Sequence, residues 1–166
     1  MARYEDKRSI WVPHPPEVAF VPVRRIGGTT GWYAWDALWR LRGWLDRRIG
    51  GPGLAGRRDP DAVAVGEALD FWEVEAFEPD RLLRLRARMR VPGEARLEFR
   101  VEPEAGGSIV RQEATFDARG LLGRAYWYAV LPFHGLVFGG MLRGLVRAMA
   151  AVEQSSHSRG ESGTRA

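Results

Sequence analysis

The chain of 166 residues contains no cysteine, which excludes disulfide bonds, thiol catalysis and cysteine-ligated zinc. Lysine is almost missing as well: Lys7 is the only one, and all other basic side chains are arginines. The N-terminal segment MARYEDKRSIW carries charges where the apolar part of a secretory signal peptide would lie, so we expect no signal peptide. These absences favour a reducing, cytoplasmic location.

Length and composition predict one globular domain. The chain is long enough to bury a core, and 45% of its residues are hydrophobic and 28% are charged. The net charge is +4, but glutamates alternate with the arginines, so we expect no nucleic-acid partner. We place the domain at residues 8–152. The polar segments 1–7 and 153–166 are expected to be disordered.

Residues 125–142, AYWYAVLPFHGLVFGGML, form the longest stretch without a formal charge. Such a run is long enough to span a membrane, and it is equally typical of a helix buried inside a soluble fold. Pro132 predicts a kink, and four glycines between residues 135 and 144 leave one side of the helix bare. In a membrane the same glycine spacing would favour helix dimers. A membrane-associated interaction module through 125–142 therefore stays open as an alternative.

Four segments of alternating polarity predict an antiparallel meander. They are separated by turns rich in Pro, Gly and Asp, and they lie at 69–77, 82–91, 95–102 and 107–117. Before the meander we expect a short strand at 9–12 and helices at 15–26 and 31–50. After the meander we expect one long helix at 121–150.

Charge pairing predicts the registers of two hairpins, closed by four-residue turns at 78–81 and 103–106. The expected pairs are Glu73 with Arg86, Glu75 with Arg84, Val74 with Leu85, Glu98 with Arg111 and Arg96 with Glu113. The middle hairpin, within 82–102, is left open. Closing it so that Arg88 meets Glu98 would also set Arg90 against Arg96.

These registers place the charged residues on one face of the sheet and the apolar residues on the other. The apolar face consists of Trp72, Val74, Leu83, Leu85, Ala87, Met89, Ala95, Leu97, Phe99, Val110, Ala114 and Phe116. It needs a cover, and the helix at 121–150 is the largest apolar element that follows. We therefore predict an α+β fold in which a curved antiparallel sheet clasps a kinked C-terminal helix around an apolar cavity, in preference to a membrane span.

This order of elements resembles the START-like, polyketide-cyclase-like (SRPBCC) helix-grip superfamily. Three stretches, GGTTGWYAWDALWRLRGWLDRRIGGPG, VGEALDFWEVEAFEPDRLLRLRARM and AYWYAVLPFHGLVFGGML, resemble an uncharacterised bacterial family that is often fused behind NmrA-like NAD(P)-binding domains. The resemblance implies a cavity for a lipophilic or aromatic small molecule and a working relationship with an NAD(P)-dependent dehydrogenase. It carries no catalytic motif to numbered positions, so enzymatic activity stays unassigned.

Three polar residues share the expected cavity side. His134 is the one titratable residue of the apolar helix, so it is a candidate for proton transfer. Gln112 and Asp70 are candidates for orienting a ligand or polarising a carbonyl, because buried polar groups need partners. In the competing interpretation His134 is a hydrogen-bonded core residue. Gln112 and Asp70 would then bond to the terminal helix, through Tyr126 or Tyr128, and only fix the fold.

We expect the ligand to contact mainly large apolar and aromatic side chains. The candidate ligand-binding residues are Asp70, Trp72, Met89, Leu97, Gln112, Phe116, Tyr126, Phe133 and His134. Arg57 and Arg58 are candidates for binding an anion at the rim, with solvated loop charges as the alternative. Residues 51–56 satisfy G-x-G-x-x-G, but a helix precedes them instead of a strand, so we interpret them as a loop. No cofactor and no metal are expected.

Overall fold

The computed structural model of the chain describes residues 2–27, 30–34, 36–51, 59 and 61–162, with residues 156–162 given by their backbone alone. The elements are β1 (Ala2–Val12), α1 (Pro16–Arg24), α2 (Asp36–Arg48), β2 (Ala68–Leu69), β3 (Trp72–Glu78), β4 (Leu82–Ala87), β5 (Gly93–Glu104), β6 (Gly107–Ala118) and α3 (Gly120–Ser162). Strands and helices thus follow one another in the expected order.

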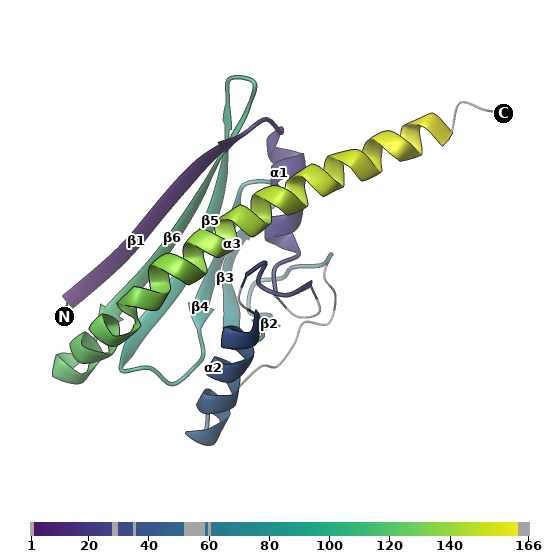
Figure 1. The fold of residues 1–166 in the computed structure, drawn as a ribbon. Coiled ribbons are helices and arrows are strands. Elements are labelled where there is room, and N and C mark those ends of the chain that lie inside the picture. Colours follow the sequence, from purple (N-terminus) through teal and green to yellow (C-terminus); the bar gives the residue numbers. More distant parts are fainter. Residues whose placement is uncertain (1, 28–29, 35, 52–58, 60, 163–166) are drawn as a thin grey trace.

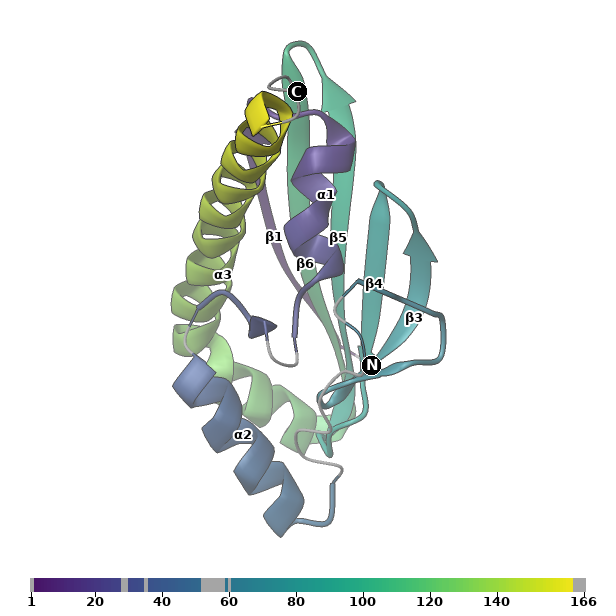
Figure 2. The same cartoon turned by 90° about the vertical axis from the view of Figure 1, so that its right-hand side faces the viewer.

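The strands form one antiparallel sheet in the order β1-β6-β5-β4-β3-β2. The long helix α3 runs across one face of this sheet, with α1 beside it and α2 near its N-terminal end (Figures 1 and 2). A two-layer arrangement of this kind buries the apolar face of the sheet under the helices. The expected α+β helix-grip architecture is confirmed.

The core lies between the inner face of the sheet and two helices. Leu85, Leu97 and Phe99 of the sheet are fully buried, as are Met141 and Leu145 of α3. Helices α1 and α3 together cover the sheet, whereas the sequence analysis predicted only the C-terminal helix as its cover. Phe20 of α1 is buried, and its ring centroid lies 6.0 Å from that of Phe77 on β3.

The outer face of the sheet carries paired charges, as expected. Arg84 donates to Glu98 at 2.6 Å, and Arg86 donates to Glu73 at 2.9 Å. Each such pair is worth little in free energy because it is partly exposed to solvent. The pairs instead help to select the register of each strand and the face that it buries. A strand shifted by one residue would turn its arginines into the core.

In the hairpin of β3 and β4 the predicted register holds only for the half that is remote from the turn. Glu73 faces Arg86 and Val74 faces Leu85, as expected. A bulge after Val74 then sets Ala76, instead of Glu75, opposite Arg84. A bulge inserts one unpaired residue, so charge alternation alone could not reveal it. Glu75 instead accepts hydrogen bonds from Arg96 on β5 at 3.1 and 3.2 Å.

The register predicted for β5 and β6 is wrong by two residues. The strands continue to Glu104 and Gly107, so the turn has two residues, and Glu98 lies opposite Glu113 and Arg100 opposite Arg111. Gly106 has a positive φ of 75°, which tight two-residue hairpin turns require. This error keeps the same residues on the inner face, because side chains alternate with a period of two residues.

The middle hairpin, whose turn the sequence left open, pairs Arg84 with Glu98 and Arg86 with Arg96. Strand β4 ends at Ala87, earlier than the expected residue 91, and β5 begins at Gly93. The expected strand at 69–77 is also divided: β2 and β3 pair across a tight turn at Asp70 and Phe71, where Asp70 has a φ of 55°.

Both ends of the chain are more regular than expected. Residues 2–7 were expected to be disordered, but they belong to β1, which pairs along its whole length with β6, from Ala2 opposite Ala118 to Val12 opposite Ser108. Tyr4 fixes this segment by stacking on Trp127 at 5.0 Å. Helix α3 continues to Ser162, beyond the expected end at residue 150. The domain boundary at 8–152 stays a prediction.

Helix α3 is apolar enough in composition to cross a membrane, with a mean hydropathy of 1.5 in its most apolar window, of which 39% is buried inside the protein. Its residues Met141, Leu145 and Met149 are fully buried against the sheet and α1. This part of α3 is a core helix of the domain. Pro132 lies within α3, and Figure 2 shows α3 changing direction along its length.

Candidate functional site

A pocket of about 290 Å³ opens between α2, the first half of α3 and the inner face of the sheet. Its lining residues are mostly apolar or aromatic. They are Leu38, Trp39, Leu41, Arg42 and Leu45 on α2; Trp72, Met89, Val91, Ala95, Arg96, Ala114, Thr115 and Phe116 from the sheet and its loops; and Tyr126, Trp127, Val130, Phe133, His134, Val137 and Phe138 on α3. The predicted cavity between sheet and helix therefore exists, with α2 as a third wall.

Stacked aromatic rings stiffen two walls of the pocket. On the α2 side Trp39 stacks on Trp32 at 5.1 Å, and Trp32 in turn stacks on Phe71 at 6.0 Å. On the sheet side Trp127 lies parallel to Phe116 at 6.1 Å. Such stacking holds large flat side chains in place. The pocket is thus bounded by rigid aromatic surfaces.

His134 is the histidine of α3 that lines the pocket. Its ring lies 4.7 Å from the ring centroids of both Trp127 and Phe138. Its Nδ1 is buried, makes no hydrogen bond within the described part of the chain, and lies 3.8 Å from Oδ2 of Asp6. Arg8 holds that carboxylate at 3.0 Å. The carboxylate of Asp6, on β1, therefore lies next to the imidazole of His134.

The pKa of His134 is lowered from its ordinary value, chiefly because burial disfavours the charged imidazolium. The carboxylate of Asp6 opposes this shift, and the guanidinium of Arg8 adds to it. The imidazole is consequently favoured in its neutral form near pH 7. A neutral imidazole can accept or donate a proton, whereas an imidazolium can only donate one.

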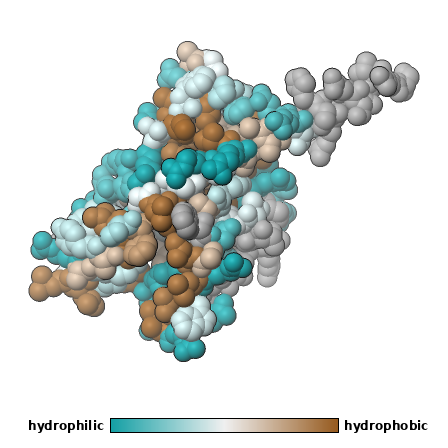
Figure 3. All heavy atoms as spheres, in the orientation of Figure 1, coloured by the Kyte–Doolittle hydropathy of each residue, from teal (hydrophilic) through white to brown (hydrophobic). Residues whose placement is uncertain are grey.

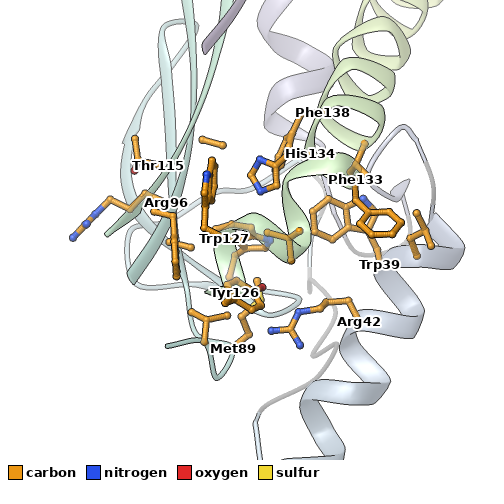
Figure 4. A pocket seen from close by; sticks show the side chains of 18 of the residues that line it. Trp39, Arg42, Met89, Arg96, Thr115, Tyr126, Trp127, Phe133, His134 and Phe138 are labelled. Atoms are coloured by element: carbon orange, nitrogen blue, oxygen red, sulfur yellow. The ribbon is translucent and has the colours of Figure 1, made fainter. Parts of the chain in front are cut away.

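Six of the nine candidate ligand-binding residues line the pocket: Trp72, Met89, Phe116, Tyr126, Phe133 and His134. Figure 4 shows Met89 and Tyr126 at one side of the space, His134 with Phe138 at another, and Phe133 beside Trp39. Their placement follows from the alternation along the strands and from the helical period of α3. Whether these side chains contact a ligand stays a prediction.

Leu97, Gln112 and Asp70 do not line the pocket. Leu97 is fully buried in the core. Gln112 donates its amide N–H to the carbonyl of Phe138 at 3.2 Å, and Asp70 accepts a hydrogen bond from Nε1 of Trp32 at 2.9 Å. Both polar residues thus connect elements of the fold, although their partners are not the tyrosines considered above. A catalytic set of His134 with Gln112 or Asp70 is not assembled.

The predicted anion site at Arg57 and Arg58 lies outside the described residues, as do residues 52–56 of the glycine-rich stretch. The sequence analysis missed the contribution of α2, above all Trp39 and Arg42, because nothing in the pattern showed where this helix would dock. It also missed Asp6 and Arg8. Their alternation with Tyr4 along residues 2–8 was the available signal.

Helix α2 is attached to the sheet by one buried carboxylate. Asp46 is fully buried, and its Oδ1 accepts the backbone N–H of Arg90 at 2.8 Å, beyond the end of β4. A buried carboxylate needs such hydrogen bonds, since an unsatisfied charge would be costly. This contact helps to set the position of α2 relative to the sheet, and so the position of the α2 wall of the pocket.

A sequence profile of the family described as "Protein of unknown function (DUF2867)" matches residues 1–141 of the chain. No curated protein gives a significant match. The profile covers the sheet, α1, α2 and the part of α3 that lines the pocket.

Three solved structures share the fold at low sequence identity. Protein MLL2253 from Mesorhizobium loti has a TM-score of 0.51 and 17% identity, over 89% of this chain and 98% of that one. Truncated norcoclaurine synthase from Thalictrum flavum has a TM-score of 0.52 and 10% identity, over 89% and 93%. The Zhui aromatase/cyclase from a Streptomyces species has a TM-score of 0.51 and 13% identity, over 90% and 94%. These similarities show the START-like helix-grip fold that the sequence predicted.

Proposed function

Because the chain belongs to the DUF2867 family, whose description assigns no activity, we propose a function from the pocket itself: the protein binds a small hydrophobic or aromatic molecule there. The observation that carries this proposal is the aromatic-walled pocket of about 290 Å³. Ligand sites in proteins are mostly apolar hollows of roughly 300–1,000 Å³ with a few polar groups. The pocket falls at the lower end of that range, which suits a compact ring system rather than a long chain.

The names of two fold neighbours, a norcoclaurine synthase and an aromatase/cyclase, support a small organic molecule as the ligand. The side chains support it more directly. Trp39, Phe116 and Trp127 offer flat apolar surfaces, and burying a flat ring between such surfaces is favourable by about 25 cal/mol per Å² of apolar area.

Filling the pocket tests this proposal. The neutral dye Nile red is titrated against the wild type and against Ala95→Trp, whose new indole enters the pocket from β5. Val130→Trp does the same from α3, and Ala129→Trp places an indole on an exposed position of α3 that does not line the pocket. We expect the two filling variants to lose dye binding and Ala129→Trp to keep it. Equal binding by all folded variants, checked by circular dichroism, would overturn the proposal.

A second candidate function is a polyketide-cyclase-like enzyme that uses His134 for proton transfer. The close approach of Asp6 to His134 favours it, since a carboxylate behind an imidazole stabilises the charge that proton transfer creates. With a cyclisable substrate, His134→Ala should abolish turnover while the thermal midpoint stays near that of the wild type. Retained turnover would remove His134 from the chemistry, and loss of folding would make it a core residue.

Two further predictions rest on the family resemblance and on composition. One is that the domain is accessory to an NAD(P)-dependent oxidoreductase, through an NmrA-like domain or a separate protein. The other is a cytoplasmic location. Affinity purification from the native cells followed by mass spectrometry tests the first, because it reports an attached oxidoreductase, and cell fractionation followed by immunoblotting tests the second.

A further inference from the structure

We propose that the ligand carries an anionic group, a carboxylate or a phosphate, and that Arg42 of α2 binds this group at one end of the pocket. The inference rests on the proposed function and makes it more specific. It assigns the ligand a chemical class, an amphipathic acid whose apolar body lies between the aromatic walls. It also assigns the orientation of the ligand, with its charged end at α2.

The first observation is that Arg42 lines an apolar pocket without a counter-ion. No carboxylate of the described residues lies within ion-pair distance of its guanidinium, and Arg42 makes no side-chain hydrogen bond there either. The arginines of the sheet behave differently. Arg84 pairs with Glu98 at 2.6 Å, and Arg96 pairs with Glu75 and Glu94.

The second observation is the direction of the side chain. Figure 4 shows Arg42 extending from α2 towards Tyr126 and Met89, at the opposite end of the pocket from His134 and Phe138. The hydroxyl of Tyr126 has no hydrogen-bond partner among the described residues, so it provides a second donor at the same end. A guanidinium and a hydroxyl together suit the oxygens of a carboxylate or phosphate.

The surroundings strengthen the attraction. Leu38 and Leu45 lie four and three residues from Arg42 on the same face of α2, and Figure 4 shows Met89 near the guanidinium, so a bound ligand would exclude water from the charge pair. Coulomb interactions grow as the local dielectric constant falls, and a bidentate guanidinium pair adds geometric fit. A neutral ligand would lack this interaction, and a cationic ligand would be repelled by the arginine.

The other cations near the pocket do not take this role. Arg96 also lines the pocket, but Glu75, Glu94 and Asp117 lie within 3.1, 2.9 and 3.7 Å of its guanidinium nitrogens. Figure 4 shows its side chain pointing away from the pocket. On α2 itself, Arg48 stacks over Trp44 at 4.4 Å, and Arg40 and Arg47 are exposed and do not line the pocket.

The experiment uses four compounds that share one apolar body and differ in charge: 2-naphthoate, 2-naphthyl phosphate, 2-naphthalenemethanol and 2-naphthylmethylammonium. Each is titrated calorimetrically into the full chain at low and at high salt. We expect 2-naphthoate or 2-naphthyl phosphate to bind about tenfold more tightly than the alcohol, which corresponds to about 1.4 kcal/mol. The preference should shrink at high salt, since ions screen the pair. The better of the two anions identifies carboxylate or phosphate as the group.

Three variants assign the preference to one side chain. Arg42→Met keeps the length and apolar stem, and it should make the affinities for acid and alcohol equal. Arg42→Lys keeps the charge but loses the bidentate geometry, so it should retain only part of the preference. Arg47→Met removes an exposed charge from the same helix, and it should leave the preference unchanged.

The outcomes separate this inference from the proposed function. If the alcohol binds as tightly as both anions, or if Arg47→Met lowers the preference as much as Arg42→Met, the role of Arg42 is wrong while the hydrophobic pocket stands. If none of the four compounds binds and Nile red also fails to bind, both proposals fall. Thermal unfolding of each variant shows that it is folded before it is titrated.

Discussion

Two parts of α3 are both predominantly apolar, but they have different surroundings. The rear half, residues 137–149, contributes Met141, Leu145 and Met149 to the core, all of them fully buried. The front half, residues 120–136, leaves Leu121 82% exposed and Phe133 56% exposed. One predominantly apolar helix therefore has two roles. Its rear half holds the fold together, and its front half forms a wall of the pocket.

The exposed apolar side chains of the front half are not isolated. Figure 3 shows hydrophobic surface over the N-terminal end of α3 and over α2. On α2 the exposed residues include Leu41, Trp44 and Leu45, and Ile49 directly after the helix is exposed too. Leu41, Leu45 and Phe133 also line the pocket. The apolar surface on this side of the molecule is therefore continuous with the pocket.

The largest effect that we expect comes from truncating the rear half. Leu145→Ala should lower the free energy of unfolding by about 2–5 kcal/mol, because it leaves a cavity in the packed core. The matched change Leu131→Ala in the front half should cost about 0.5 kcal/mol, because that side chain is largely exposed. Urea unfolding followed by circular dichroism measures both. Similar losses at the two positions would show that the front half also holds the fold.

The glycines provide the next test of the comparison. A Cβ at Gly144 would collide with the backbone carbonyl of Tyr33, so Gly144→Ala should destabilise the protein by about 1–3 kcal/mol. A Cβ at Gly135 would have only Nη2 of Arg8 nearby, at 3.9 Å. Gly135→Ala should therefore stabilise the helix by up to about 1 kcal/mol. Thermal melts of the two variants should shift in opposite directions, and a shared direction would contradict the division of α3.

A ligand-binding test addresses the front half. Phe133→Ala removes a ring that lines the pocket and is half exposed, so we expect Nile red to bind roughly tenfold more weakly, in line with the loss of part of a buried ring. Stability should change little. Leu136→Ala is the matched control, because this residue is 45% exposed and does not line the pocket. If both variants bind the dye like the wild type, the front half does not contact the ligand.

The smallest effect is a dependence on pH. The pKa of His134 in the folded protein is lowered, mainly by burial, so below the ordinary value of 6.5 the unfolded chain binds a proton that the folded chain does not. Stability from this group is therefore complete above pH 6.5 and declines as the pH falls. Urea unfolding between about pH 7.5 and 5.5 should show a smaller decline for His134→Gln than for the wild type. An equal decline would assign the pH dependence to other groups.

The sequence predicted which face of each strand is buried, and the reason is general. Side chains alternate with a period of two, so the apolar face survived the error in the register of β5 and β6, which amounts to two residues. The turn itself depended on the backbone of Gly106, and the bulge depended on the packing around Glu75. Neither leaves a trace in the charge pattern.

The candidate site was predicted only in part. Tyr126, Phe133 and His134 could be identified because they belong to one apolar helix that had to cover the sheet. Arg42 could not, since α2 docks through long-range contacts, such as the hydrogen bond from the backbone of Arg90 to Asp46 and the ring contacts of Trp39 with Phe71 and Phe138. Asp6 and Arg8 were missed because a segment so rich in charge was expected to be disordered, although it forms an edge strand.

Pro132 lies in α3 near the junction of its front half, residues 120–136, and its rear half, residues 137–149. Proline has no backbone N–H, so the carbonyl of Tyr128 lacks its usual helical partner, and both residues are on the solvent side, where water can replace it. A helix interrupted in this way flexes more easily there than elsewhere. The front half is therefore joined to the rear half through a weakened turn, and the stacking of Trp127 on Tyr4 and Phe116 keeps it against the sheet.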